Sequence, residues 1–158
     1  CGPWGPETEM KAILTALLRQ YRSTGYGGEF RLDTTGAMFH VIPTTRRGDR
    51  GVDEPYQAIL STELNFDAAG REQSAFEALE ELLGNLTLVT GTNVVVGTVP
   101  DGVLRRAKVV GRGGRRSARS ELIRILACAG GRLSWRLLYD YGEASFLLNI
   151  GLVWPAYK

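Results

Sequence analysis

Residues 120–150 read SELIRILACAGGRLSWRLLYDYGEASFLLNI, and this stretch decides the fold of the C-terminal half. Its first part predicts a helix over about 118–129 with Ser117 as the N-cap, because apolar residues recur at spacings of three and four. Those apolar positions are Leu122, Ile125, Leu126 and Ala129. After a Gly-Gly stop, apolar and polar residues alternate over 133–137, and residues 144–153 return as a second strand. The stretch therefore predicts a helix followed by an antiparallel hairpin.

The same order of elements occurs near the N-terminus. Residues 11–42 read KAILTALLRQYRSTGYGGEFRLDTTGAMFHVI. The spacing predicts an amphipathic helix over about 7–23, followed by a hairpin of residues 29–33 and 37–42. Two interpretations stay open: the two segments are a true internal repeat, or any two helix–hairpin units look this similar.

A further helix is predicted over about 73–90. Ser74 and Glu77 have the Ser-x-x-Glu spacing of a capping box at its start. The expected buried stripe comprises Phe76, Leu79, Leu82, Leu83, Leu86 and Val89. Gly84 lies inside this helix, where glycine costs about 1 kcal/mol relative to alanine. We therefore expect another element to pack closely against Gly84.

Shorter patterns predict the connecting segments. Strands are expected at three places, within residues 59–67, over 93–96 and over 103–110. Pro100-Asp101-Gly102 predicts a turn, and both residues 43–55 and the Gly-Arg-rich residues 111–116 are expected to be loops.

These elements together predict an α+β fold. We expect three helices packed on antiparallel or mixed sheet, as two similar α-β-β lobes in one compact body. An N-terminal helix–hairpin lobe with its connecting loop would cover residues 1–72, and the second lobe would cover residues 73–158.

The composition is that of a globular protein. The chain has 158 residues, of which 44% are hydrophobic and 23% charged, and its formal net charge is +2. These values exclude disordered, collagen-like and coiled-coil classes. No apolar run reaches the roughly 18 residues that a membrane-spanning helix needs.

Two cysteines bear on the compartment. The chain starts at Cys1, which fits a processed N-terminus, a lipid-anchored exported protein or an artificial end. Cys128 falls in the apolar pattern of a helix, which favours a buried, inert thiol. A Cys1–Cys128 disulfide in an oxidising compartment stays open.

Catalytic and metal-binding motifs are missing from the sequence. His40 is the sole histidine, it falls in a predicted strand, and no nucleophile motif surrounds its candidate partners. A zinc site would need three or four Cys, His or carboxylate ligands. We therefore expect no catalytic residues, no metal and no cofactor.

Charge is distributed unevenly along the chain. Residues 53–81 hold eight acidic side chains and one basic, whereas residues 105–136 hold ten basic and one acidic. The two blocks either neutralise each other within one fold, pair between copies, or leave the basic block to bind a polyanion. The candidate interaction residues are Arg105, Arg106, Lys108, Arg112, Arg115, Arg116 and Arg119 on the basic side, and Glu72, Glu77, Glu80 and Glu81 on the acidic side.

The C-terminal half also resembles a known family. Within residues 76–150 the sequence contains EALEELLGNLTLVTGTNVVV and then VLRRAKVVGRGGRRSARSELIRILACAGGRLSWRLLYDYGEASFLLNI. This pattern resembles the short N-terminal domain of secretins and TonB-dependent receptors. By resemblance, residues 93–96 are the first strand of that domain, residues 120–130 a helix of it and residues 133–137 the strand that follows. The resemblance implies a small α+β sandwich that mediates protein contacts and ring or complex assembly in the periplasm, without catalysis.

The function expected from the sequence is therefore a non-catalytic, exported domain for protein–protein interaction or self-assembly. It would serve as a subunit of a periplasmic or cell-envelope complex, ring or filament. It would have no transmembrane segment, and Cys1 is a candidate position for a lipid anchor. The alternative is a module that binds nucleic acid or another polyanion through residues 105–119.

Overall fold

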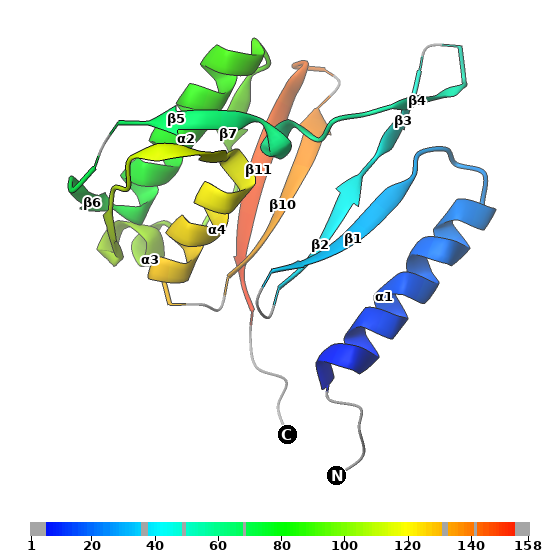
Figure 1. Cartoon of the computed structure of the whole chain (residues 1–158), viewed down its shortest axis with the longest axis horizontal. Coiled ribbons are helices and arrows are strands. Elements are labelled where there is room, and N and C mark those ends of the chain that lie inside the picture. Colours follow the sequence, from blue (N-terminus) through cyan, green and yellow to red (C-terminus); the bar gives the residue numbers. More distant parts are fainter. Residues whose placement is uncertain are drawn as a thin grey trace. The chain divides into compact units, whose positions relative to one another are not determined.

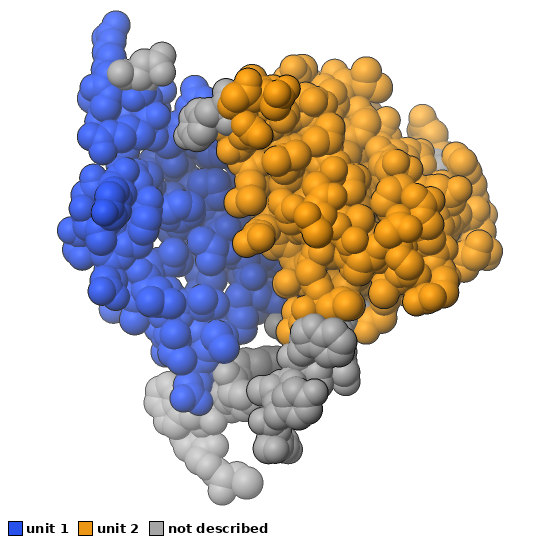
Figure 2. Space-filling model, turned by 180° about the vertical axis from the view of Figure 1, so that it is seen from behind, with its two compact units in different colours: residues 1–58 blue, residues 59–158 orange. Residues whose placement is uncertain are grey.

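The protein divides into two compact units, residues 1–58 and residues 59–158 (Figures 1 and 2). The structure is a computed structural model, and it describes residues 6–35, 38–48, 50–67, 69–130, 133–140 and 142–153. The division lies before the 72/73 boundary expected from the sequence, because residues that follow Ala58 pair with strands of the second unit.

Unit 1 consists of one helix and two hairpins. Its elements are α1 (Pro6–Ser23), β1 (Phe30–Thr35), β2 (Met38–Pro43), β3 (Thr45–Arg47) and β4 (Asp53–Pro55). The helix and the β1–β2 hairpin are confirmed, with Phe30 opposite Pro43 in an antiparallel register. α1 packs on β1.

The expectation of a loop over residues 43–55 is wrong, because β3 and β4 form a short antiparallel hairpin there. Arg46 lies opposite Glu54, and Arg47 lies opposite Asp53. Opposite charges at facing positions stabilise strand pairs, but they leave none of the apolar alternation by which a sequence reveals a strand.

Unit 2 contains the remaining elements. In chain order they are η1 (Ile59–Ser61), β5 (Glu63–Phe66), β6 (Glu72–Ser74), α2 (Ala75–Thr90), β7 (Val94–Val96), α3 (Asp101–Arg106), β8 (Lys108–Val110), β9 (Gly114–Ser117), α4 (Ala118–Cys128), β10 (Leu133–Asp140) and β11 (Ser145–Leu152). β10 and β11 are antiparallel, and β11 pairs in parallel with β7, so the sheet is mixed. Figure 1 shows α2 and α4 on the same side of this sheet. The α+β class is confirmed.

A long two-stranded ribbon forms the other half of unit 2. β5 pairs with β9 and β6 pairs with β8, both antiparallel, so residues on either side of α2 and β7 meet across about 35 to 55 positions of sequence. The Ala118 backbone N–H donates to the Thr62 carbonyl, and the Ala75 backbone N–H donates to the Ala107 carbonyl. These two hydrogen bonds extend the ribbon by one position at each end. The core lies between this ribbon, the two helices and the sheet. Its fully covered side chains include Leu79, Leu82, Leu86, Leu104, Leu122, Ile125, Leu148 and Val109.

Two expectations for this ribbon are wrong. Residues 103–110 were expected to form one strand, but α3 takes up their first part and only Lys108–Val110 is extended. The Gly-Arg-rich residues 111–116 were expected to be a flexible loop, but β9 begins at Gly114, and Gly111 exchanges backbone hydrogen bonds with Gly70 and Arg71.

Helices α2 and α4 begin where the sequence predicts. Ser74 caps α2: its hydroxyl accepts from the Glu77 backbone N–H, and the Glu77 carboxylate accepts from the Ser74 backbone N–H at 2.8 Å. Ser117 caps α4 by accepting from the Ser120 backbone. The predicted stripe of α2 is right at its four leucines but wrong at Val89, which is exposed near the end of the helix.

The expected close packing against Gly84 is also wrong. Gly84 is exposed, and a Cβ built there would meet nothing within 4 Å outside its own helix.

We therefore expect Gly84→Ala to raise the free energy of unfolding by about 1 kcal/mol, since only the backbone entropy of glycine is removed. Urea-induced unfolding measures this change. Gly91→Ala is the matched control and should destabilise, because Gly91 ends α2 in the left-handed region at φ 66°.

Candidate functional site

The acidic and basic blocks of the sequence meet along the ribbon of unit 2. Glu63 of β5 lies 3.9 Å from Arg115 of β9, and Glu72 of β6 lies 4.0 Å from Lys108 of β8. In both pairs the partner is two residues from the directly opposed position, which is the diagonal neighbour that long side chains reach. All four side chains are largely exposed, so each pair contributes at most about 1 kcal/mol.

A second cluster, the Glu121 clamp, lies at the short segment of residues 111–113 that joins β8 to β9. It consists of Glu121, Arg116 and Arg124. Glu121 is 5% exposed, and its carboxylate accepts hydrogen bonds from Arg116 Nε and from Arg124 Nε and Nη2. Each of the two arginine side chains is only about one-fifth exposed to solvent. Arg116 also stacks over the Phe66 ring, with its guanidinium carbon 4.3 Å from the ring centroid.

The Glu121 clamp holds the Gly-Arg-rich segment in place. Arg124 Nη1 donates to the carbonyl of Val110 at 3.0 Å, while Arg116 donates to the carbonyls of Arg112 and Gly113. These carbonyls lie between the β6–β8 pair and the β5–β9 pair, whose strand registers differ. Arginine side chains therefore supply the hydrogen-bond donors that a partner strand would otherwise supply. The clamp therefore explains why this stretch is ordered although its composition suggests a loop.

Electrostatics within the clamp favour the charged state of its members. Burial raises the pKa of the Glu121 carboxyl, but the hydrogen bonds and charges of Arg124 and Arg116 outweigh burial and leave that pKa below its usual value. The hydrogen bond from Arg124 to Glu121 in turn raises the pKa of the guanidinium. The two arginines thus share the single negative charge of Glu121 in one hydrogen-bonded unit.

The other candidate basic residues are placed separately. Arg105 binds the Asp101 carboxylate through Nε at 2.7 Å and lies over the Phe76 ring at 4.0 Å. Arg106 and Arg112 are exposed, and Arg119 is half-buried at the start of α4. Because Arg116 is turned inward and Arg105, Lys108 and Arg115 have acidic neighbours, the basic block presents less uncompensated charge than its sequence suggests.

The candidate acidic residues lie on β6 and α2. Glu77 serves the capping box, where hydrogen bonds from the backbone and side chain of Ser74 lower the pKa of its carboxyl. Glu81 accepts from Gln73 at 3.0 Å, and Glu80 is exposed. The structure brings Glu72 and Glu63 to basic partners but does not gather all the acidic residues at one point.

The residues considered for catalysis or redox chemistry belong to different elements. His40 is a buried residue of β2, opposite Asp33 in the strand register. The expectation of a buried Cys128 is wrong: this residue ends α4, beyond the covered stripe, and is exposed. Cys1 and Arg132 lie outside the described residues. Within the described ranges, no three His, Cys, Asp or Glu side chains are grouped closely enough to hold a metal ion.

The uncovered face of α1 is a site that sequence reasoning did not single out. Met10, Ile13 and Leu17 follow one another at spacings of three and four, and they are 46%, 48% and 54% exposed. We call these three residues the α1 stripe. The sequence shows that α1 is amphipathic, but it cannot show how much of the apolar surface the neighbouring β1 covers.

Comparison with known proteins adds no assignment to these surfaces. None of the helices in the described part of the chain combines the length and apolar character needed to cross a bilayer. No family model matches the chain, and neither a curated protein nor a solved structure matches it.

Proposed function

We propose that this protein is a non-catalytic, exported domain that binds other proteins, by self-association or as a subunit of an envelope complex. The observation that carries the proposal is the α1 stripe, where three large apolar side chains on one face of the helix are about half exposed. Apolar side chains aligned along one helix are a common way for proteins to bind a second helix or a groove.

The packing of unit 1 supports this proposal. Among its described residues only Ile42, Ala58 and His40 are buried, although the unit has a helix of 18 residues and two hairpins. A helix on a two-stranded hairpin buries little apolar surface, so covering the α1 stripe would stabilise the unit. At about 25 cal/mol per Å² of apolar surface, each side chain that becomes covered contributes on the order of 1 kcal/mol.

The export and assembly parts of the proposal rest on the sequence resemblance. The pattern over residues 76–150 is similar to that of short N-terminal domains of secretins and TonB-dependent receptors, for which periplasmic assembly is expected. A lipid anchor at Cys1 remains part of the same proposal.

Size-exclusion chromatography with light scattering, at low and high salt, tests self-association. We expect the full chain to associate at micromolar concentration and Leu17→Glu to reduce this, because the substitution places a charge within the α1 stripe. Ala12→Glu, on the same exposed helix but outside the stripe, is the matched control and should behave as the wild type. A monomer at every concentration, with no envelope protein crosslinked to the α1 stripe in cells, would contradict the proposal.

A further inference from the structure

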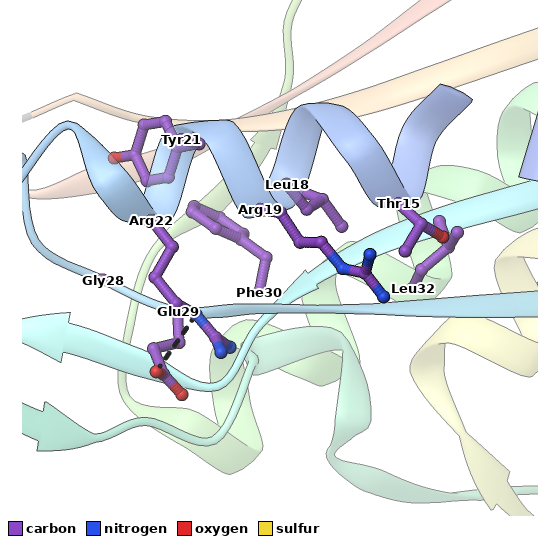
Figure 3. Close-up of a pocket in the computed structure, with 9 residues that line it drawn as sticks. All are labelled: Thr15, Leu18, Arg19, Tyr21, Arg22, Gly28, Glu29, Phe30 and Leu32. Carbon is purple, nitrogen blue, oxygen red and sulfur yellow. Dashed lines mark ion pairs between the residues drawn. The ribbon is translucent and has the colours of Figure 1, made fainter. Parts of the chain in front are cut away.

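A groove between α1 and β1 has the composition of a small ligand site. Its volume is about 220 Å³, and its apolar part is formed by Leu18, Phe30 and Leu32. Arg19, Arg22 and Glu29 line it as well (Figure 3). The apolar side chains come from both the helix and the strand, so the groove lies where α1 packs on β1.

One end of the groove is held by fixed contacts. The rings of Tyr21 and Phe30 meet edge to face with their centroids 5.4 Å apart, and the Tyr21 hydroxyl donates to the Gly27 carbonyl at 3.1 Å. An enclosed cavity of about 150 Å³ accommodates benzene in another protein. The volume here is therefore sufficient for one aromatic ring or branched alkyl group together with a small polar head.

The charged rim carries an excess of positive charge. Arg22 Nε lies 3.3 Å from the Glu29 carboxylate, which compensates that guanidinium. Arg19 is exposed, and no carboxylate among the described residues lies within ion-pair distance of it. Figure 3 shows the Arg19 side chain extended from α1 toward Leu32. Two guanidinium groups thus share one carboxylate, and the planar fork of arginine favours a second carboxylate as partner.

We propose that this groove binds an apolar carboxylate, with a body of ring or branched-alkyl size against Leu18, Phe30 and Leu32 and its carboxylate on Arg19. A free carboxylic acid and the C-terminal residue of a polypeptide share this chemistry. The site is independent of the proposed function, because the lining residues of α1 do not include any residue of the α1 stripe.

Heteronuclear NMR titration of the full chain tests the site with three probes: 3-phenylpropionate, N-acetyl-phenylalanine and the uncharged 3-phenylpropanamide. We expect saturable binding of the two acids, with shifts confined to α1 and β1, and binding of the amide weaker by about tenfold, since a charge-assisted hydrogen bond is lost. Stronger binding of N-acetyl-phenylalanine identifies a polypeptide C-terminus as the source, and stronger binding of 3-phenylpropionate identifies a free acid.

Three variants separate this binding from nonspecific attraction. Arg19→Gln should weaken binding of both acids by about tenfold, whereas Glu29→Gln should strengthen it, because Arg22 is released to the ligand. Arg31→Gln is the matched control: Arg31 is an exposed β1 arginine paired with Asp33, and its loss should leave binding unchanged.

A further variant tests the apolar part of the groove. Thr15→Phe fills the groove from α1 without changing its charge, and it should abolish binding of both acids while the circular dichroism spectrum stays that of the wild type. Absence of saturable binding to either acid, equal binding of the amide, or unchanged binding by Arg19→Gln would overturn the site. None of these results bears on self-association through the α1 stripe.

Discussion

Replacing Glu121 with alanine should lower the free energy of unfolding of unit 2 by about 3 kcal/mol, the largest effect expected from a single charged residue among those that the structure describes. Glu121 is the shared acceptor of two guanidinium groups that are themselves mostly covered. Removing it leaves both positive charges without compensation, and it also releases the side chains that hold the carbonyls of residues 110, 112 and 113.

Urea-induced unfolding followed by tryptophan fluorescence measures this effect, because Trp135 packs against the core of unit 2. Glu121→Gln keeps the shape of the side chain but removes its charge, so it should cost less than Glu121→Ala and more than a surface substitution. Glu80→Ala removes an exposed glutamate of α2 and should change stability by less than about 0.5 kcal/mol. Equal stabilities for Glu121→Ala and Glu80→Ala would show that the Glu121 clamp contributes nothing.

The clamp also predicts how stability depends on pH. The pKa of the Glu121 carboxyl is lowered from its usual value near 4.5 in the folded protein. A depressed carboxyl pKa stabilises the fold above the unfolded pKa, and this contribution is lost as the pH falls through the folded pKa. The stability difference between wild type and Glu121→Gln should therefore be constant near neutral pH and shrink below about pH 4.5. Glu77 also has a lowered pKa, but it is present in both proteins and cancels in the comparison.

Local signals predicted the three long helices α1, α2 and α4 and the two long hairpins of this fold. The capping box at Ser74 and the N-cap at Ser117 depend on residues three positions away, and apolar spacing depends on residues three or four away. Such signals lie within one element. They predict α2, α4 and the β10–β11 hairpin regardless of what the rest of the chain does.

The ribbon of unit 2 could not be predicted in this way. β9 has the sequence Gly-Arg-Arg-Ser, which has neither alternation nor β-branched residues, and it is extended because β5 pairs with it from some fifty residues away. The Glu121 clamp depends on the same pairing, since its arginines bind carbonyls at the junction of β8 and β9 within the ribbon. From the sequence, Glu121 stands out only as the single acidic residue of the basic block.

Helix α3 was missed for a different reason. Pro100, Asp101 and Gly102 are turn residues, but proline and an acidic residue also favour the start of a helix, and Arg105 and Arg106 favour its end. The six residues are too few for a repeated apolar spacing to show. In the structure, the backbone N–H groups of Leu104 and Ala107 donate to the carbonyls of Pro100 and Val103, four residues earlier, and Leu104 is buried against the core.

That burial leads to the second prediction with a large effect. Leu104→Ala should lower the free energy of unfolding by about 2–5 kcal/mol, because Leu104 is fully buried and the substitution leaves a cavity. Val109→Ala, in β8, should also destabilise, since Val109 is fully buried as well. Arg106→Ala, two positions after Leu104 on the same helix but exposed, is the control and should change stability by less than about 0.5 kcal/mol.

These variants also decide between the helix and the strand. In one continuous strand over residues 103–110, side chains alternate between the two faces, so residues 104 and 109, which are an odd number of positions apart, would lie on opposite faces. With one face on the core, only one of the two substitutions would then be costly. In the structure both side chains reach the core, because the chain turns from α3 into β8 at Ala107. A large loss of stability for Val109→Ala with none for Leu104→Ala would therefore restore the strand and remove α3 from the fold.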